Sequence, residues 1–249
     1  MSLRDKSRWL RQWVPFGART IGYGTISITL GPLTGDHRAS AWAARQWSRS
    51  TMRGLGIAVE VDGLERVPSG AVVYASNHQS LLDILVLGAV LPGDFKWATK
   101  RSVMNVPFLG WHLRLAGHVP VDRSQGKSTA VVVAERFEQV LRAGKPLLVF
   151  PEGTRSQDGQ LKAFKNGGFY AAVRAGRPVL PIALEGTYGL MSRDAVDTGE
   201  MAERESRLVR VRIGAPLEPA TDGSEEERIV DLRDRTRVAV AAMLDELRH

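Results

Sequence analysis

The chain has 249 residues, which is long enough for one large domain or for a domain with an appendage, and its composition is that of a folded protein. It contains no cysteine, which excludes disulfides, thiolate nucleophiles and cysteine-based zinc sites and fits a reducing compartment. The net charge of +7 belongs to the N-terminal fifth: residues 1–53 contain nine of the 34 basic and two of the 27 acidic residues, which leaves 25 of each sign for residues 54–249.

The basic N-terminal segment also contains four of the six tryptophans, Trp9, Trp13, Trp42 and Trp47. Tryptophan beside basic residues suits the headgroup region of a bilayer. The longest stretch without an ionisable residue, 20–35, is shorter than the roughly 20 residues that span a membrane. It ends in Gly31-Pro32-Leu33, which predicts a break between two helices. We therefore predict that residues 1–56 form two helices lying on or dipping into one leaflet.

Two alternatives for this segment stay open. The helical pair could pack on the rest of the chain, or it could bind nucleic acid. Nucleic acid is the weaker alternative, because no helix-turn-helix, zinc-finger or RNA-binding signature accompanies the charge, and we expect no nucleic-acid partner. The N-terminus also lacks the order of basic, apolar and small residues found in a signal peptide, so we expect no export.

From residue 57 onwards, short apolar runs alternate with helical stretches. Six runs are β-branched or continuously apolar and predict strands: 57–61, 71–75, 119–121, 147–150, 179–184 and 208–213. Five segments predict helices: 83–90, 106–115, 129–143, 168–175 and 225–247. The alternation predicts that residues 57–249 form an α/β domain, an αβ sandwich with a mostly parallel or mixed central sheet.

The stretch Asn77-His78-Gln79-Ser80-Leu81-Leu82-Asp83 follows the second predicted strand. Loops at the carboxyl ends of strands line the crevice of open α/β sheets, so we expect His78 at such a rim. In one continuous helix His78 and Asp83 would point about 140° apart, so they can meet only if the helix begins between them. Ser80 is a candidate N-cap, and Ser80-x-x-Asp83 resembles a capping box. Either Asp83 simply closes the helix beside an incidental His78, or the turn folds His78 back onto Asp83.

The stretch Phe150-Pro151-Glu152-Gly153-Thr154-Arg155-Ser156 follows the fourth predicted strand. Glycine, hydroxyls and arginine at a strand end suit the recognition of an anion such as phosphate, although a β-turn with a solvated arginine is the alternative. Four other basic residues could join such a site or could be ordinary surface cations: Lys100, Arg101, Arg123 and Lys165.

Other chemistries find little support. We expect His112 and His118 to be structural, and scattered histidines without a carboxylate at ligand spacing make a poor metal site. The chain has no G-x-S-x-G elbow, Walker A loop or dinucleotide fingerprint, which disfavours a serine hydrolase and a nucleotide-binding protein.

The pattern Asn77-His78-x-x-x-x-Asp83, followed further along by residues 150–156, resembles the glycerolipid acyltransferases, in particular the bacterial 1-acyl-sn-glycerol-3-phosphate acyltransferases. Two weaker blocks, Gly117 to Arg123 and Val179 to Ile182, occur in the family's order. The resemblance covers about residues 57–215. It implies an αβ sandwich, which in some bacterial members follows a helical pair in the membrane.

The resemblance also implies a reaction and a site. His78 would be the general base and Asp83 its partner, and the acceptor's phosphate would be bound by Glu152, Gly153, Thr154, Arg155, Lys100, Arg123 and Lys165. The enzyme would move a fatty acyl group from acyl-CoA or acyl-carrier protein to the free hydroxyl of 1-acyl-glycerol-3-phosphate, with no cofactor and no metal. It would work at the cytoplasmic face of an anionic membrane as a monotopic or peripheral protein, with acyl-carrier protein as a candidate partner.

Two alternatives to this function stay open. An acyltransferase of the same family could use another lysolipid or a glycolipid as the acceptor. A non-catalytic basic protein that binds acidic membrane surfaces would also account for the charge of the N-terminal segment.

Overall fold

The computed structural model describes residues 3–34, 38–121, 126–191 and 207–249. Its centre is a seven-stranded sheet in the order β1-β7-β6-β2-β5-β3-β4. The strands are β1 (Ala58–Asp62), β2 (Val73–Ser76), β3 (Lys96–Lys100), β4 (Val119–Val121), β5 (Leu147–Val149), β6 (Val179–Glu185) and β7 (Leu208–Ile213). The six predicted strands are confirmed to within two residues at each end. The prediction omitted β3, whose sequence Lys-Trp-Ala-Thr-Lys has lysine at both ends.

The sheet is mixed, as expected. Strands β6, β2, β5, β3 and β4 run parallel to one another, whereas β7 is antiparallel to β6 and parallel to β1. The carboxyl ends of five strands therefore lie along the same edge of the sheet. That edge carries the loops that follow β2 and β5, which contain the two sequence motifs.

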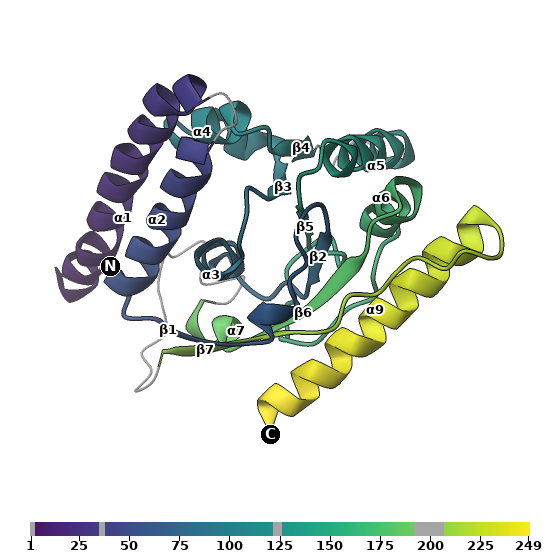
Figure 1. Cartoon of the computed structure of the whole chain (residues 1–249). Helices are drawn as coiled ribbons and strands as arrows, with labels where there is room; N and C mark the ends of the chain where they lie inside the picture. The colour runs from purple at the N-terminus through teal and green to yellow at the C-terminus, as the bar shows by residue number, and fades with distance from the viewer. Residues whose placement is uncertain (1–2, 35–37, 122–125, 192–206) are drawn as a thin grey trace.

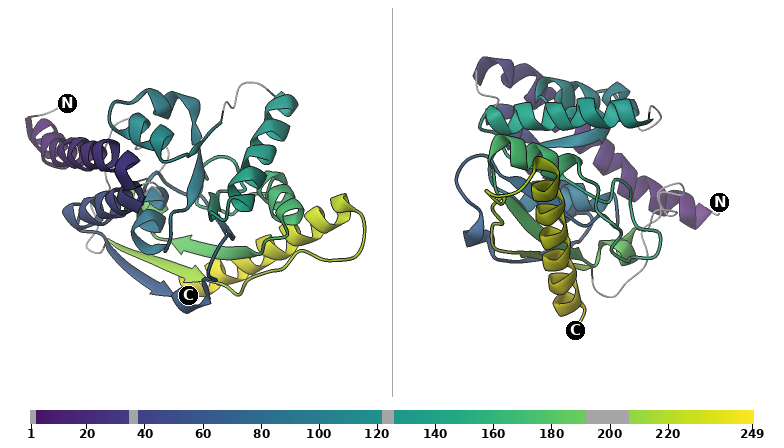
Figure 2. Two further views of the ribbon diagram at one scale, coloured as in Figure 1. Left: turned by 45° about the horizontal axis from the view of Figure 1, so that its top comes forward. Right: turned by 90° about the vertical axis from the view of Figure 1, so that its right-hand side faces the viewer.

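Helices cover both faces of the sheet (Figure 1). They are α1 (Leu3–Leu30), α2 (Arg38–Gly54), α3 (Leu82–Val90), α4 (Leu109–Leu115), α5 (Gly126–Arg142), α6 (Gly167–Ala175), α7 (Thr187–Leu190) and α9 (Glu225–Arg248), with 3-10 turns η1 (Pro32–Thr34), η2 (Leu64–Arg66) and η3 (Arg101–Asn105). The N-terminal pair and α9 lie on opposite sides of the sheet (Figure 1 and the left view of Figure 2).

Alternation along the strands explains this three-layer arrangement. In β2, Tyr74 points into a core beneath α2, α3 and α4, while its neighbours Val73 and Ala75 point into a second core beneath α5, α6 and α9. In β5, Leu148 and Leu147 divide in the same way. Parallel strands buried on both faces read as continuously apolar runs, which is why most were visible in the sequence.

One predicted helix needs correction. The segment 106–115 is helical only from Leu109, because Val106 is extended before Pro107 and Phe108 has a positive φ of 61°. A residue before proline is driven out of the helical region, so a helix seldom runs through it.

The predicted break between two N-terminal helices is confirmed, since α1 ends at Leu30 and α2 begins at Arg38. No helix in the described part of the chain is both long enough and apolar enough to cross a membrane. The pair packs on the body: Arg45 and Arg49 donate to the main-chain oxygens of Leu91 and Ala89 at the end of α3, at 2.8 and 3.0 Å. Cations at a helix C-terminus satisfy its last carbonyl groups.

Candidate active site

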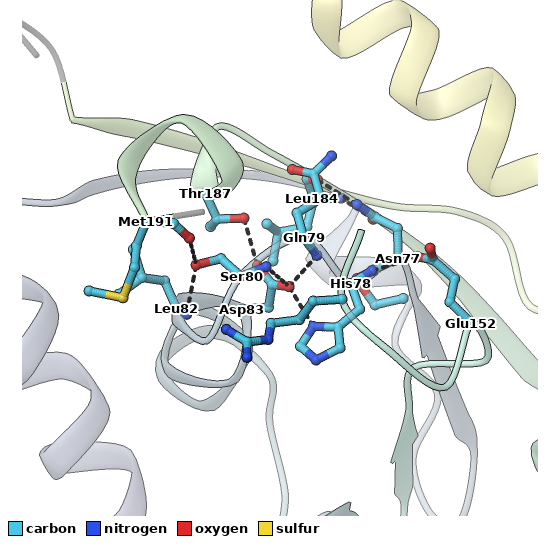
Figure 3. A network of polar contacts seen from close by, with 12 residues as sticks. Asn77, His78, Gln79, Ser80, Leu82, Asp83, Glu152, Leu184, Thr187 and Met191 are labelled. Carbon is cyan, nitrogen blue, oxygen red and sulfur yellow. Dashed lines mark hydrogen bonds and ion pairs between the residues drawn. The ribbon is translucent and has the colours of Figure 1, made fainter. Parts of the chain in front are cut away.

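His78 and Asp83 are brought together at the end of β2. The loop turns before α3 begins at Leu82, and His78 Nδ1 lies 2.7 Å from Asp83 Oδ2 (Figure 3). Asp83 is fully buried, and His78 is only 8 % exposed. The geometrical condition set by the sequence, a helix that begins between the two residues, is met.

The Asp83 carboxylate also closes the loop. Its Oδ2 accepts hydrogen bonds from the main-chain N–H groups of Gln79 at 2.7 Å and Ser80 at 2.9 Å, and Oδ1 accepts one from the hydroxyl of Thr187 at 2.6 Å. A carboxylate has about four acceptor positions, so these three donors and His78 satisfy it. Both interpretations of the motif therefore hold at once: Asp83 closes the turn and contacts the histidine.

Ser80 does not take the N-cap position predicted for it. The cap of α3 is Leu81, one residue later, and it makes no side-chain capping bond. The Ser80 hydroxyl instead accepts from the main-chain N–H of Leu82 at 3.2 Å and donates to the main-chain oxygen of Met191 at 2.6 Å. The serine thus links the loop to the end of α7, a contact between distant segments that a local capping pattern does not contain.

Asn77 fixes the other end of the loop. Its amide donates to the main-chain oxygen of Leu184 and accepts from the main-chain N–H of the same residue, both at 2.8 Å. The side chain thereby continues the pairing of β2 with β6 for one residue beyond the end of β2. An asparagine carries the donor and the acceptor that this double bond requires.

The second motif holds the main chain of His78 from the neighbouring strand end. Glu152 Oε1 accepts from the His78 N–H at 2.7 Å, and the Ser156 N–H donates to the His78 oxygen at 2.8 Å. The ring of Phe150 stacks on the imidazole with a centroid distance of 4.0 Å and an angle of 18°. These contacts fix both the backbone and the ring plane of His78.

Nδ1 of His78 faces Asp83, so the second ring nitrogen, Nε2, points away from the carboxylate (Figure 3). Within the described residues no hydrogen bond to Nε2 is present. A neutral imidazole that donates from Nδ1 to a carboxylate keeps an acceptor lone pair on Nε2. The arrangement can therefore take a proton from a group placed beside Nε2.

Both carboxylate oxygens of Glu152 accept hydrogen bonds from main-chain N–H groups of the protein. Its second oxygen accepts from the main-chain N–H of Lys162 at 3.1 Å, and only 4 % of the residue is exposed. Burial raises the pKa of this carboxyl, and the two N–H donors, from His78 and Lys162, oppose that rise. The geometry links Glu152 to the placement of His78, whereas the sequence had associated it with an anion.

The remaining residues expected at a phosphate site are distributed as follows. The Lys165 side chain lies directly over Gly153. A Cβ added to that glycine would come within 2.7 Å of Lys165 Nζ. Gly153 also needs its positive φ of 73°, and its N–H donates to the main-chain oxygen of Phe150 within the turn.

The other residues expected at a phosphate site lie further apart. Thr154 and Arg155 follow Gly153 in the same loop and are half-buried. Lys100 is exposed at the end of β3, and Arg123 lies outside the described residues.

An apolar cavity lies between the N-terminal helical pair and the body. Its lining includes Tyr23, Trp47, Ile84, Phe95, Trp97 and Phe108. Ile84 directly follows Asp83 in α3, so the cavity is adjacent to the helix that carries the carboxylate. Arg45, Asp94 and His112 also contribute to the lining.

Metal chemistry gains no support from the geometry. Across the part of the chain that the structure describes, no group of three or more histidine, aspartate or glutamate side chains is arranged to hold a metal ion. His112 and His118 are buried, as expected for structural histidines, and burial lowers the pKa of both.

Sequence reasoning did not identify Thr187, the donor to Asp83, or the stacking role of Phe150. Thr187 directly follows Glu185 and Gly186 at the carboxyl end of β6, beside β2. Its position at the carboxyl end of a strand could have marked Thr187 as a candidate site residue, because ligand crevices form there. No local sequence pattern connects it to Asp83.

Comparison with known proteins gives a consistent result. A family model described as Acyltransferase matches residues 58–185. The 1-acyl-sn-glycerol-3-phosphate acyltransferase of Pseudomonas aeruginosa is 34% identical over 187 residues, which are 74% of this chain and 72% of that protein. The enzyme of the same name from Saccharomyces cerevisiae is 30% identical over 229 residues, 90% of this chain and 73% of that protein.

A solved structure extends the similarity to the fold. The crystal structure of the 1-acyl-sn-glycerophosphate acyltransferase PlsC from Thermotoga maritima matches with a TM-score of 0.70 and 25% identity. The match covers 95% of this chain and 98% of that chain.

Proposed function

This chain belongs to the acyltransferase family, and from that premise we propose that it transfers a fatty acyl group from a thioester to the free hydroxyl of 1-acyl-glycerol-3-phosphate, giving phosphatidic acid. The relatives that carry this activity in their names support the acceptor and a place in phospholipid biosynthesis. The observation that carries the mechanism is the buried His78–Asp83 pair, with its 2.7 Å bond and its second ring nitrogen directed away from the carboxylate.

In this mechanism His78 is the general base. Nε2 takes the proton of the acceptor hydroxyl while the hydroxyl oxygen attacks the thioester carbonyl. The tetrahedral intermediate then collapses, the C–S bond breaks, and the leaving thiolate takes the proton back from the imidazolium. A positioned base of this kind contributes about 10² to 10⁴ in rate. Asp83 keeps Nδ1 protonated and stabilises the positive ring between the two steps.

No protein nucleophile takes part in this scheme. The chain contains no cysteine. Within the described residues, no serine hydroxyl is hydrogen-bonded to Nε2 of His78. A direct attack by the acceptor needs only that the base, the hydroxyl and the thioester be held together. The same scheme serves acyl-CoA and acyl-carrier protein, and we propose that either can be the donor.

We assign the acceptor's phosphate to the loop of residues 153–155 and to Lys165. Lys165 is held beside this loop by its own main-chain N–H, which donates to Pro151 at 2.8 Å. Arg155 supplies a planar fork of donors, which suits a phosphate better than a point charge does. Lys100 is the last residue of β3, and Arg123 comes two residues after β4 in the sequence. The carboxyl ends of these strands lie on the same edge, and we include both residues as outer members of the site. Glu152 is assigned to positioning His78.

We assign part of the fatty acyl chain to the apolar cavity beside α3, because the cavity volume of about 50 Å³ is too small for a whole chain. An acyl chain gains roughly 0.8 kcal/mol for each methylene group that it buries. The aromatic and aliphatic lining of the cavity supplies such surroundings close to the carboxylate-bearing helix.

We further propose that the helical pair rests on the cytoplasmic face of an anionic membrane, as a monotopic or peripheral anchor. The pair and the turn between its helices pack on the body and still expose large apolar residues: Leu10, Val14, Ile21, Leu30, Leu33 and Trp42. Apolar side chains beside excess basic charge suit an interfacial helix. Co-sedimentation with anionic vesicles that weakens with added salt checks this part, and binding that is insensitive to salt would contradict it.

The reaction is tested with purified protein, a radiolabelled acyl thioester in both donor forms, and an acceptor panel. The panel contains 1-acyl-glycerol-3-phosphate, glycerol-3-phosphate and other lysolipids. We expect labelled phosphatidic acid from the first acceptor and a loss of about 10² to 10⁴ in kcat for His78→Ala. If labelled product forms only with another acceptor, that lipid is the substrate and 1-acyl-glycerol-3-phosphate is not. A His78→Ala protein with the wild-type rate would refute the base.

A further inference from the structure

Thr187 is the first residue of α7 and is fully buried. Its hydroxyl donates to Asp83 Oδ1 at 2.6 Å, although the two residues are 104 positions apart (Figure 3). The chain reaches this point through Gly186, which has a φ of 101°, and a Cβ there would come within 2.5 Å of the Leu208 oxygen. Only glycine allows the turn that carries the chain from β6 to Thr187.

The bond from Thr187 goes to one oxygen of the Asp83 carboxylate, and the other bonds go to the second oxygen. His78 and the main-chain N–H groups of Gln79 and Ser80 all bind Oδ2. Among the described residues Thr187 alone donates to Oδ1. A carboxylate held by one oxygen can rotate about its Cβ–Cγ bond, whereas donors on both oxygens fix its plane. Thr187 therefore completes the set of donors that fixes the direction in which Oδ2 faces His78 Nδ1.

The position of the hydroxyl is itself fixed by the catalytic loop. Ser80 donates to the main-chain oxygen of Met191 at 2.6 Å, and the Met191 N–H donates to the Thr187 oxygen at 3.0 Å. The short helix α7 is thus tied to the loop at both ends, by Thr187 at its start and by Met191 just after its end. These bonds hold the main chain of Thr187 beside Asp83.

We propose that Thr187 is a positioning residue for acyl transfer, which acts through Asp83 to orient the imidazole of His78. The proposal rests on the proposed function, in which His78 is the base. Thr187 exchanges no proton during the reaction: its hydrogen stays on Oγ1, and the proton that moves passes between the acceptor hydroxyl, Nε2 and the leaving thiolate. Its contribution is the orientation of the base before the proton is transferred.

The test removes the hydroxyl and keeps the shape. For Thr187→Val we expect kcat to fall about tenfold, with little change in the KM for the acceptor, because the loss affects the base and not the acceptor's contacts. Thr187→Ser keeps a hydroxyl at the same carbon, and we expect it to restore kcat to within about twofold of the wild type. A purely structural role would not separate the two variants in this way, because serine leaves the larger gap.

Thr236→Val is the matched control. Thr236 is also fully buried, and its hydroxyl makes a bond of the same 2.6 Å, but to the main-chain oxygen of Leu232 inside α9. We expect Thr236→Val to lower the melting temperature without changing kcat. A comparable fall in kcat for both valine variants would assign the effect of Thr187 to general destabilisation and overturn the proposal.

A proton NMR measurement on the apo protein supplies a second readout. The Nδ1 proton of His78, held against a buried carboxylate, should give a downfield resonance that exchanges slowly with water in the wild type and in Thr187→Ser. In Thr187→Val we expect this resonance to broaden or disappear. If the valine variant does not accumulate as folded protein, Thr187→Ala provides the same comparison without a methyl group against the carboxylate.

The outcomes separate the two proposals. If His78→Ala retains turnover, the proposed base is wrong and the role of Thr187 falls with it. If His78→Ala is inactive while Thr187→Val keeps the wild-type kcat and the downfield resonance, only the inference about Thr187 is overturned. Loss of kcat in Thr187→Val with recovery in Thr187→Ser supports both.

Discussion

His78 and His112 are two buried histidines with similar surroundings and different partners. They are 8 % and 7 % exposed, and Nδ1 of each lies within a short hydrogen bond of one side chain. For His78 the partner is the Asp83 carboxylate at 2.7 Å, and for His112 it is the Ser27 hydroxyl at 2.6 Å. Burial, and after it the charge of Lys96, lowers the pKa of His112 to about 4. Burial and a nearby cation therefore keep the His112 ring neutral beside its hydroxyl partner, whereas a carboxylate can accompany a ring that must gain a proton.

The largest effect is expected from removing the charge that distinguishes the two sites. Asp83→Asn keeps an oxygen for the loop N–H donors but gives His78 a neutral partner, as Ser27 is to His112. We expect kcat to fall about 10³-fold, which corresponds to about 4 kcal/mol of transition-state stabilisation. Initial rates at saturating acceptor measure it.

Asp231→Asn is the control for that substitution. Asp231 pairs with Arg235 on the exposed side of α9, far from the loop in sequence. We expect it to retain the wild-type rate. A kcat for Asp83→Asn within about twofold of the wild type would mean that the charge of Asp83 does not assist His78, and the contrast with His112 would then have no catalytic meaning.

The next effect concerns His112 and the stability of the fold. The unfolded chain binds a proton at this residue near pH 6.5, but the folded chain does so only near pH 4, so the unfolded state holds more protons between these values. Stability therefore falls as the pH falls through this window, by on the order of 3 kcal/mol for His112. His118 acts in the same direction, because burial also lowers its pKa.

His112→Gln isolates the contribution of one ring. Glutamine is polar and does not titrate, so the variant should lose less stability than the wild type between pH 7.5 and pH 4. Urea unfolding at both pH values measures the difference, and other titrating groups cancel in the comparison of the two proteins. Equal losses in the two proteins would show that His112 takes up its proton without unfolding.

The fold was largely readable from the sequence because most strands are continuously apolar, and β1 and β7, which alternate with charged residues, are rich in valine. The exception, β3, contains Lys96, which is 5 % exposed and lies 2.5 Å from Asp94. Burial lowers the pKa of this lysine, and the bond to Asp94 opposes that change. An ion pair with a residue two positions away makes a buried lysine possible, and hydrophobic patterning counts such a residue as surface.

The site was readable only where its contacts are local. His78 and Asp83 are five residues apart, so a turn between them could be anticipated. Glu152 reaches His78 across 74 positions and Thr187 reaches Asp83 across 104, and both contacts depend on the order of strands in the sheet. The sequence suggested an anion-binding loop at residues 150–156, but it contained no sign that this loop also holds the main chain of the histidine.

The smallest change in kcat is expected for a substitution of Glu152. It tests the second difference between the two histidines, the hydrogen bonds of their main chains. The main chain of His112 lies in α4 and bonds to Phe108 and Ala116, whereas His78 lies in a loop that borrows an acceptor from Glu152. Glu152→Gln leaves one acceptor oxygen for two N–H donors. We expect kcat to fall about tenfold, or about 1.4 kcal/mol, with the KM for the acceptor nearly unchanged.

The division between kcat and KM decides what Glu152 does. A residue that positions the base changes kcat, because the acceptor binds as before but the proton transfer is misaligned. A residue that helps to bind the acceptor's phosphate changes KM instead. Glu226→Gln, on the exposed first turn of α9, controls for the loss of a negative charge. A raised KM with an unchanged kcat would return Glu152 to the anion site.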